Sequence, residues 1–136
     1  MKKVLIIFLG FILCLCITSC SGREYNELDL YDFGENYSDN IVLAEQTYLD
    51  EYVFCQGYVS GIQSDKFWLY CDKEMDLSKY SHLVCFFHKS DKELTSAVAA
   101  LKKGDEVIIY GKVIKIEDSY PTDNLHMQID RIEKAN

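Results

Sequence analysis

The sequence predicts an all-β fold with helices: a small five-stranded barrel with one helix between the third and fourth strands and a short helix before the first. Three observations predict it. The composition is that of a globular domain, with 49% hydrophobic and 13% aromatic residues. Segments in which apolar and polar residues alternate, typical of half-buried strands, recur from residue 52 onward. Between the third and the fourth of these segments, the apolar period changes to that of a helix.

The first expected element is the short helix. Asp39 or Asn40 can cap it, because a side-chain oxygen at this position accepts the N–H groups of the first helical turn. Apolar residues follow at helical spacing from Ile41, and the helix should end near Leu49. The chain would then enter the first strand.

Five strands are expected, each a run of β-branched and aromatic residues bounded by turn signals. They are Tyr52–Ile62, Lys66–Cys71, His82–His88, Glu106–Ile116 and Leu125–Ile132. Gly57 and Gly61 in the first run indicate a bend or a bulge, as a strongly curved sheet requires.

A capping motif predicts where the helix between the third and fourth strands begins. Ser90 and Glu93 have the S-x-x-E spacing of a capping box, and apolar residues recur at i, i+3, i+4 and i+7 from Leu94. Two lysines and then Gly104 end the helix, since cations stabilise its negative end and glycine tolerates the backbone conformation beyond it.

This order of elements is that of the OB-fold, a five-stranded Greek-key barrel. Residues 101–113 contain the pattern L-x2-G-D-x-V-x3-G-x-V, preceded by Y-x5-Y-V-x2-I from Tyr52 and V-C-F from Val84. Together these patterns resemble the tRNA-anticodon-binding-like OB-domain family, of which bacterial lipoproteins and small exported proteins are frequent members. The resemblance implies an OB-fold domain over residues 39–134.

The first 19 residues are expected to be a lipoprotein signal peptide. Two lysines precede a 14-residue apolar run, Val4–Ile17, which is too short to span a bilayer core of about 30 Å. The run ends in I-T-S-C, which resembles the bacterial lipobox and implies cleavage before Cys20 and attachment of diacylglycerol to its sulfur. The protein would then be exported and anchored by lipid to the cell membrane or the outer membrane. An uncleaved anchor, or an ordinary secretory signal with a chance cysteine, are the alternatives.

Residues 20–38 are expected to be the acylated cysteine and an acidic tether. The stretch from Ser21 to Asn40 has six acidic residues and one arginine, and its apolar residues show no sustained period. These features indicate a solvated spacer. Its four aromatic residues leave open that parts of it dock on the domain or on a partner; they are Tyr25, Tyr31, Phe33 and Tyr37.

Three cysteines follow Cys20, and a simple hairpin register places them in one row facing the core. A hairpin centred on Gln63 sets Cys55 opposite Cys71, and one centred on Ser78 sets Cys71 opposite Cys85. The cysteines are then either small core residues or the source of one disulfide, for which Cys71–Cys85 is favoured over Cys55–Cys71. A thiolate metal site is disfavoured because a fourth inward ligand is missing.

No pattern in the sequence indicates catalysis or a cofactor. The three histidines are scattered singly and suggest solvated strand ends. Three acids alternate after the second strand, Asp72, Glu74 and Asp76, but the glycine and glutamate of an EF-hand loop do not follow, which leaves at most a weak cation site. There is no glycine-rich phosphate loop and no nucleophile–base motif. We therefore expect no catalytic residue, no metal and no cofactor, and a protein that is not an enzyme.

The outward side of the second and third strands is the expected binding face. If the cysteines point inward, four aromatic side chains point outward: Tyr58, Trp68, Tyr70 and Phe86. OB-folds bind ligands across this face. The formal charge of −8 opposes nucleic-acid binding, which depends on neutralising phosphates. The aromatic residues either lie under the N-terminal helix or tether, or contact a protein, a peptide or a glycan.

The sequence thus predicts a membrane-anchored envelope lipoprotein with an OB-fold binding or adaptor domain. Its partners would be membrane lipid, through Cys20, and an envelope protein, peptide or glycan. The alternative is an accessory subunit of an envelope enzyme or stress system, with nucleic-acid binding a distant third.

Overall fold

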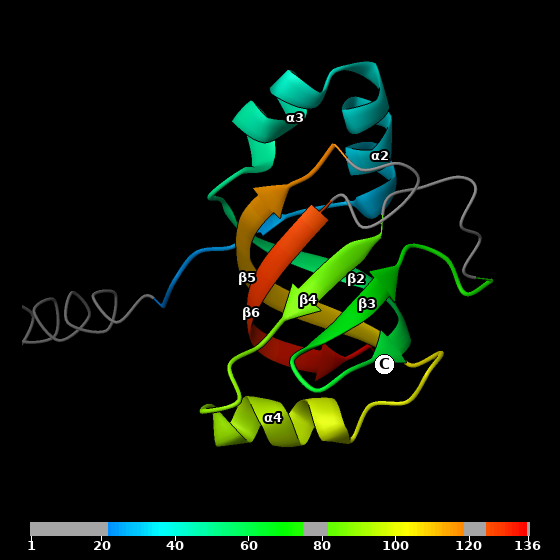
Figure 1. Cartoon of the computed structure of the whole chain (residues 1–136), viewed down its shortest axis with the longest axis vertical. Helices are drawn as coiled ribbons and strands as arrows, with labels where there is room; N and C mark the ends of the chain where they lie inside the picture. The colour runs from blue at the N-terminus through cyan, green and yellow to red at the C-terminus, as the bar shows by residue number, and fades with distance from the viewer. Residues whose placement is uncertain (1–21, 75–81, 119–124, 136) are drawn as a thin grey trace, which may run out of the picture.

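The computed structural model describes residues 22–74, 82–118 and 125–135, and its centre is a closed five-stranded barrel (Figure 1). Its strands are β2 (Tyr52–Ile62), β3 (Lys66–Tyr70), β4 (Leu83–Phe86), β5 (Glu106–Ile116) and β6 (Leu125–Lys134). The expected strands are confirmed. The third is shorter than predicted, and the last is two residues longer.

The strands pair in the order β2-β3-β4-β6-β5, and β5 pairs again with β2, which closes the barrel. The pairing of β4 with β6 is parallel and all the others around the barrel are antiparallel. This is the Greek-key arrangement of the OB-fold. Alternate strand residues point inward and form a core of aliphatic and aromatic side chains, as the two-residue period requires.

Helix α4 (Lys92–Ala99) lies between β4 and β5 and covers the lower end of the barrel (Figure 1). Its residues Leu94 and Val98 are buried, as the helical spacing predicts. The cap, however, is Asp91 and not Ser90: the Asp91 carboxylate accepts a hydrogen bond of 3.0 Å from the backbone N–H of Leu94. Both residues are favourable caps, and the carboxylate one position later takes the role.

At two positions the backbone has a conformation or a close contact that only glycine allows. Gly104 follows α4 with a φ of 90°, a conformation that strains residues with a Cβ atom. At Gly111 a Cβ atom would lie 2.3 Å from the backbone oxygen of Gln128, and the register between β5 and β6 shifts at this point. The close approach of the two strands therefore depends on this glycine.

Helices α2 (Leu30–Asp39) and α3 (Ile41–Tyr48) cover the upper end of the barrel (Figure 1). The second is the predicted short helix, and the Asn40 side chain caps it by accepting from the N–H of Leu43. The first was not predicted. Asp29 caps it by accepting from two backbone N–H groups, and its Phe33 is completely buried.

The predicted tether over residues 20–38 is therefore wrong for most of its length. Leu28, Leu30 and Phe33 belong to the core of the barrel, and β1 (Asn26–Glu27) pairs in parallel with the start of β2. Three apolar side chains on one side are enough to fix an otherwise acidic segment. The folded domain begins well before residue 39.

The predicted signal peptide over residues 1–19 and the predicted lipidation site, Cys20, lie outside the described residues. Among the residues that the structure describes, no helix is long and apolar enough to cross a membrane.

Candidate binding face

The outward residues of β3, β4 and β6 form one continuous surface. Their neighbours along each strand, such as Phe67, Leu69 and Cys85, point into the core, so the alternate residues point outward. All of these outward residues are partly exposed except Val84, which is 3% exposed. We call this surface the β3–β4–β6 face. Its members are Lys66, Trp68, Tyr70, Val84, Phe86, His126 and Gln128.

The strand register arranges this face in rows. Trp68 pairs with Val84, which pairs with His126 across the next strand. Lys66 pairs with Phe86 in the neighbouring row. Sequence reasoning predicted the aromatic members, and the structure confirms that they point outward and remain half-exposed.

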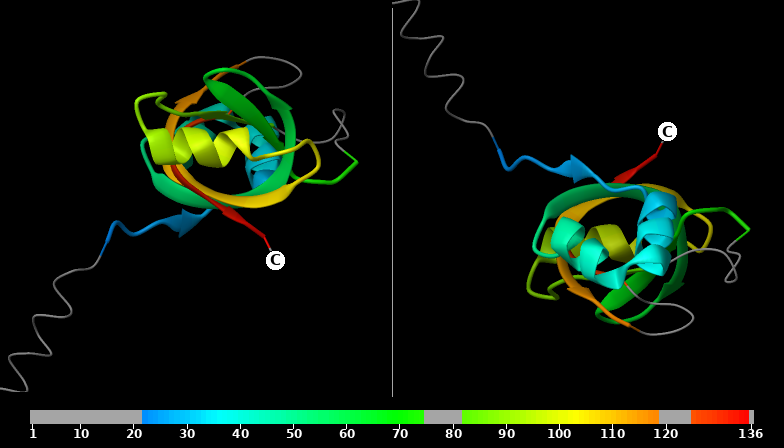
Figure 2. Two further views of the ribbon diagram at one scale, coloured as in Figure 1. Left: turned by 90° about the horizontal axis from the view of Figure 1, so that it is seen from below. Right: turned by 90° about the horizontal axis from the view of Figure 1, so that it is seen from above.

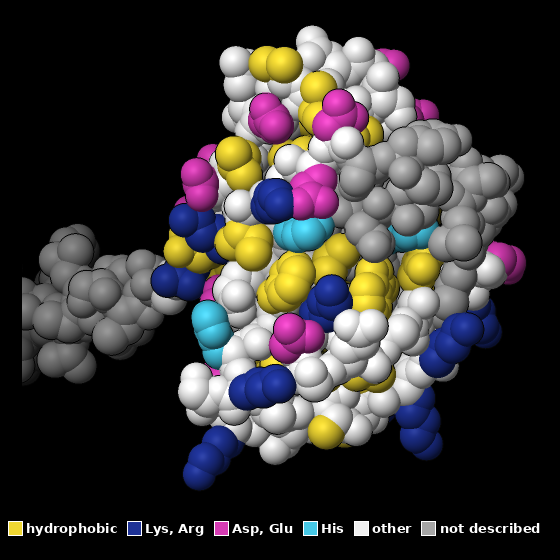
Figure 3. Space-filling model, in the orientation of Figure 1, with side chains coloured by type: hydrophobic (Ala, Val, Ile, Leu, Met, Phe, Trp, Pro, Cys, Tyr) yellow, Lys and Arg dark blue, Asp and Glu magenta, His cyan; other side chains and the backbone are white. Residues whose placement is uncertain are grey.

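A lysine stands among the aromatic rings of the face. Lys66 Nζ lies 5.3 Å from the ring centroid of Trp68 and 5.7 Å from that of Phe86, within the range of cation–π attraction. Figure 3 shows the same pattern, hydrophobic side chains gathered around a dark blue one on the front of the barrel. The Gln128 side chain donates a 3.1 Å hydrogen bond to the backbone oxygen of Phe86, which ties β6 to β4 at this point.

One edge of the face carries an ionised carboxylate. His126 lies with its ring 5.5 Å from that of Phe86, and its Nε2 is 3.8 Å from a carboxylate oxygen of Glu117. A hydrogen bond from the Lys115 ammonium lowers the pKa of Glu117, and the charges of Lys115 and His126 lower it further. The face therefore offers aromatic surface together with groups of both charges.

The solvated position expected for His82 is wrong. This residue is 2% exposed, and its ring centroid lies 3.9 Å from that of Tyr70. Because Leu69 pairs with Leu83 in the antiparallel register, His82 comes next to Tyr70, on the same side of β4 as Val84 and Phe86. His88 is exposed, as expected.

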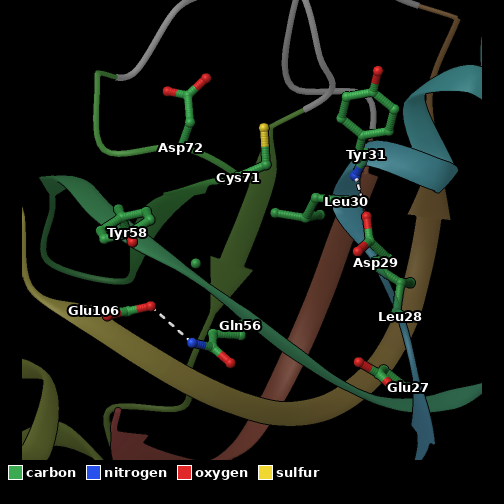
Figure 4. Close-up of a pocket in the computed structure, with 11 residues that line it drawn as sticks. Glu27, Leu28, Asp29, Leu30, Tyr31, Gln56, Tyr58, Cys71, Asp72 and Glu106 are labelled. Carbon is green, nitrogen blue, oxygen red and sulfur yellow. Dashed lines mark hydrogen bonds between the residues drawn. The ribbon is translucent and has the colours of Figure 1, made fainter. Parts of the chain in front are cut away.

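Tyr58 lies at the border between this face and an acidic cavity. It pairs with Tyr70 across β2 and β3 and with Glu106 across β2 and β5. The charge of Glu106 raises the pKa of Tyr58. The Gln56 side chain donates a 2.7 Å hydrogen bond to the same carboxylate (Figure 4).

The cavity measures about 470 Å³ and lies between the start of α2, β2 and the end of β3 (Figure 4). Its lining includes four carboxylates, from Glu27, Asp29, Asp72 and Glu106. Across the described ranges, no group of three or more histidine, cysteine or acidic residues is placed to hold a metal ion.

The predicted cysteine row is wrong in register, although its direction is right. Val59 pairs with Leu69 and Phe67 pairs with Cys85, so Cys71 is opposite neither Cys55 nor Cys85. The first hairpin is centred one residue later than predicted and the second two residues earlier. Shifting a centre by whole residues moves each partner by an even number, which keeps every side chain on its face.

All three cysteines are free thiols, so neither predicted disulfide, Cys71–Cys85 or Cys55–Cys71, is present. Cys55 and Cys85 are buried and Cys71 is half-buried. Burial raises the pKa of each thiol, most strongly for the two buried ones. Two of them are thus core residues, the first of the readings that the sequence left open.

Sequence reasoning did not predict four members of the face, which are Lys66, Val84, His126 and Gln128. Lys66 could have been found, because it has the same parity as Trp68 and Tyr70 along one strand. His126 could not, because its place depends on the parallel pairing of β4 with β6, which no local pattern indicates. The masking of the face by the N-terminal helix or tether is not seen: α2 and α3 lie at the end of the barrel, and no helix that the structure describes covers this face (Figure 1).

Comparisons with known proteins agree with this architecture. The tRNA_anti-like family model matches residues 2–124 of the chain. Among solved structures, a protein described as an aspartyl-tRNA synthetase from Leishmania major Friedlin is similar, with a TM-score of 0.54 and 12% identity over 85% of this chain and 22% of that one. OBody AM3L09, solved bound to hen egg-white lysozyme, has a TM-score of 0.51 and 16% identity over 66% of this chain and 86% of its own. At these identities the likeness shows the fold. No curated protein sequence matches.

Proposed function

The chain belongs to the tRNA_anti-like family, and from that premise we propose that it is a lipid-anchored binding module of the bacterial envelope. In this proposal the β3–β4–β6 face holds a protein, peptide or glycan ligand, and Cys20 carries the lipid. The observation that carries the proposal is the row of half-exposed aromatic side chains with Lys66 among them.

The chemistry of the face favours such a ligand. Aromatic residues are enriched at the centre of protein interfaces, where a few side chains supply most of the binding energy. The Trp68 ring is flat and half-exposed, and its neighbours Lys66 and His126 can donate hydrogen bonds to carbonyl or hydroxyl oxygens. A barrel of this fold, OBody AM3L09, is bound to a protein, hen egg-white lysozyme.

The anchor rests on the N-terminal sequence. Two lysines, a short apolar run and the I-T-S-C motif agree with a lipoprotein signal in charge, length and cleavage site. Acyl chains contribute about 0.8 kcal/mol for each buried CH₂ group, so a diacylated cysteine would hold the domain stably on a membrane.

Site-specific photocrosslinking in intact cells tests the binding face. A benzoylphenylalanine placed at Phe86 should form a covalent adduct of discrete mass, because the position lies in the middle of the face. Tyr31, an exposed aromatic residue on α2, is the matched control position and should give none. Introducing Trp68→Ala should remove the adduct at position 86. Equal adducts at both positions, or none at position 86, would contradict the proposal.

Replacing the proposed lipidated residue tests the anchor separately. Cys20→Ala should move the protein to the soluble fraction or leave its precursor uncut. Labelled fatty acid that still enters the Cys20→Ala protein would show that the assignment is wrong.

A further inference from the structure

The N-terminal segment is fixed against one side of the barrel. Arg23 Nη1 lies 3.1 Å from a carboxylate oxygen of Asp130, and the Tyr25 hydroxyl donates a 3.0 Å hydrogen bond to the same oxygen. The Arg23 guanidinium lies 4.1 Å above the ring of Tyr52. Three residues further on, β1 pairs with β2. The chain therefore enters the domain at a defined place.

That place lies across the barrel from the β3 and β4 part of the candidate binding face, whereas the β6 edge of that face borders it through the pairing of Gln128 with Lys112. In both views of Figure 2, β1 and the C-terminal end of the chain lie on one side of the barrel, while β3 and β4 lie on the opposite side. The direction of chain entry thus also fixes where the β3–β4–β6 face points.

The surface around the entry point combines tyrosines with arginines. The Tyr25 ring meets those of Tyr52 and Tyr110 edge to face, at 6.1 and 5.4 Å. The Arg131 guanidinium lies 3.8 Å above the ring of Tyr110. We call this surface the β2–β5 face; its members are Arg23, Tyr25, Tyr52, Phe54, Tyr110, Lys112 and Arg131.

The charges of the β2–β5 face are close to balanced. Arg23 pairs with Asp130, and Arg131 pairs with Glu133 at 3.3 Å. Lys112 pairs with Asp50 in the same way. Amphipathic tyrosine rings and partly exposed arginines, without a strong net charge, are the composition that suits the polar layer of a bilayer.

The length of the intervening chain brings this face to the membrane. Arg23 is three residues after Cys20, and three extended residues reach at most about 10 Å. The headgroup layer on each side of a bilayer is itself about 5–7 Å thick. If diacylglycerol on Cys20 lies in the bilayer, most of the reach of these three residues is needed to cross the headgroup layer. The β2–β5 face must then lie at the surface of the headgroups.

We propose that the β2–β5 face rests on phospholipid headgroups and that the β3 and β4 residues of the β3–β4–β6 face, Trp68 and Phe86 among them, are consequently turned away from the membrane. This inference rests on the lipid anchor of the proposed function. In this arrangement the short link to Cys20 and the docked N-terminal segment together orient the domain on the membrane. The aromatic residues of the binding face then point toward ligands in the envelope. Because the charges are balanced, the contact does not require anionic lipid.

Tryptophan quenching tests this orientation in the lipidated mature protein, reconstituted in phosphatidylcholine vesicles that carry a nitroxide on the headgroup. The chain has one tryptophan, Trp68, which lies on the far face and should be quenched weakly. In a Trp68→Phe background, Tyr110→Trp should be quenched several-fold more strongly. Tyr52→Trp should behave in the same way, which guards against misfolding of a single variant. Tyr31→Trp, at the end of the barrel, is the matched control and should resemble Trp68.

The outcomes separate this inference from the anchor. Stronger quenching at positions 52 and 110 than at 31 and 68 supports it, and the difference should persist in high salt. Vesicle-bound protein with equal quenching at all positions overturns the orientation and leaves the anchor intact. Protein that does not associate with vesicles overturns both.

Discussion

The guanidinium of Arg23 lies 3.1 Å from the carboxylate of Asp130, although the two residues are 107 positions apart in the sequence. The same carboxylate accepts a hydrogen bond from the Tyr25 hydroxyl, so one side chain of β6 holds two residues of the N-terminal segment. Both members of the ion pair are partly exposed to solvent, so the pair contributes little to global stability. Its effect is local, on the position of the chain before β1.

Replacing Asp130 should release this segment without unfolding the barrel. We expect Asp130→Ala to leave the melting temperature nearly unchanged and to speed trypsin cleavage after Arg23 several-fold, because the arginine is no longer held against Tyr52. Glu133→Ala, which removes a similar ion pair of Arg131, should not change cleavage at Arg23. Equal cleavage rates in wild type and Asp130→Ala would show that β1 alone positions the segment.

Removal of a buried aromatic side chain from α2 should destabilise the whole domain. Phe33 is fully buried against Tyr37 and Tyr48, with ring centroids 6.0 and 5.2 Å away. Phe33→Ala should therefore lower the free energy of unfolding by about 3–5 kcal/mol, measured by urea denaturation. Tyr31→Ala, on the exposed side of the same helix, should change it by less than about 0.5 kcal/mol. A solvated spacer would give the same small change for both variants.

The strands and the closing helix could be predicted from the sequence because their signals are local. Alternation over Tyr52–Ile62 and Glu106–Ile116 and the spacing after Leu94 depend only on neighbouring residues, and the structure reproduces them. The OB-fold follows from their order. The resemblance to the family rests on the same residues, and the family match agrees with it.

Other features depend on contacts between distant segments. The helix α2 has an acidic composition, and only its burial against the barrel shows that Leu30 and Phe33 decide its structure. The cysteine register depended on where two turns are centred, and a shift of one residue in a turn displaces each partner by two. For the binding face, alternation along β3 and β4 was enough to predict which aromatic residues point outward. The place of His126 could not be predicted in this way, because it depends on the parallel pairing of β4 with β6.

The alkylation rates of the three cysteines should follow their exposure, with the buried thiols reacting more slowly. Mass spectrometry of the non-reduced protein should show three alkylatable thiols at positions 55, 71 and 85. In the native state Cys71 should react first, because it is half-buried while the other two are buried. A linked peptide containing Cys71 and Cys85, or Cys55 and Cys71, would contradict the structure.

The alkylation rate of Cys71 should rise with pH, and the rise should lie at higher pH in the native protein than in the unfolded one. The thiolate is the reactive form, and burial raises the pKa of Cys71, so less thiolate is present at a given pH than in an unfolded cysteine. Its alkylation should be slower than that of the same cysteine in urea and should still rise steeply near pH 9, where an unfolded cysteine begins to level off. Identical pH profiles in the native and unfolded protein would show that Cys71 is fully solvated.

Single-stranded nucleic acid should not bind to the β3–β4–β6 face. Such binding requires a groove with several cations along the backbone, in addition to aromatic rings on which bases stack. Here Lys66 lies between the rings, but the chain has a formal charge of −8, and the Glu117 carboxylate stands at the edge of the face with its pKa lowered by Lys115.

The fluorescence of Trp68, the one tryptophan of the chain, reports directly on occupation of this face. Titration with a thymidine oligonucleotide at about 0.15 M salt should leave it unchanged, and lowering the salt should not produce the steep gain in affinity that phosphate contacts give. Micromolar binding that disappears in Lys66→Glu and in Trp68→Ala, but not in Tyr31→Ala, would establish the opposite: that the aromatic residues form a stacking platform and that this lysine is sufficient to attract a phosphate backbone.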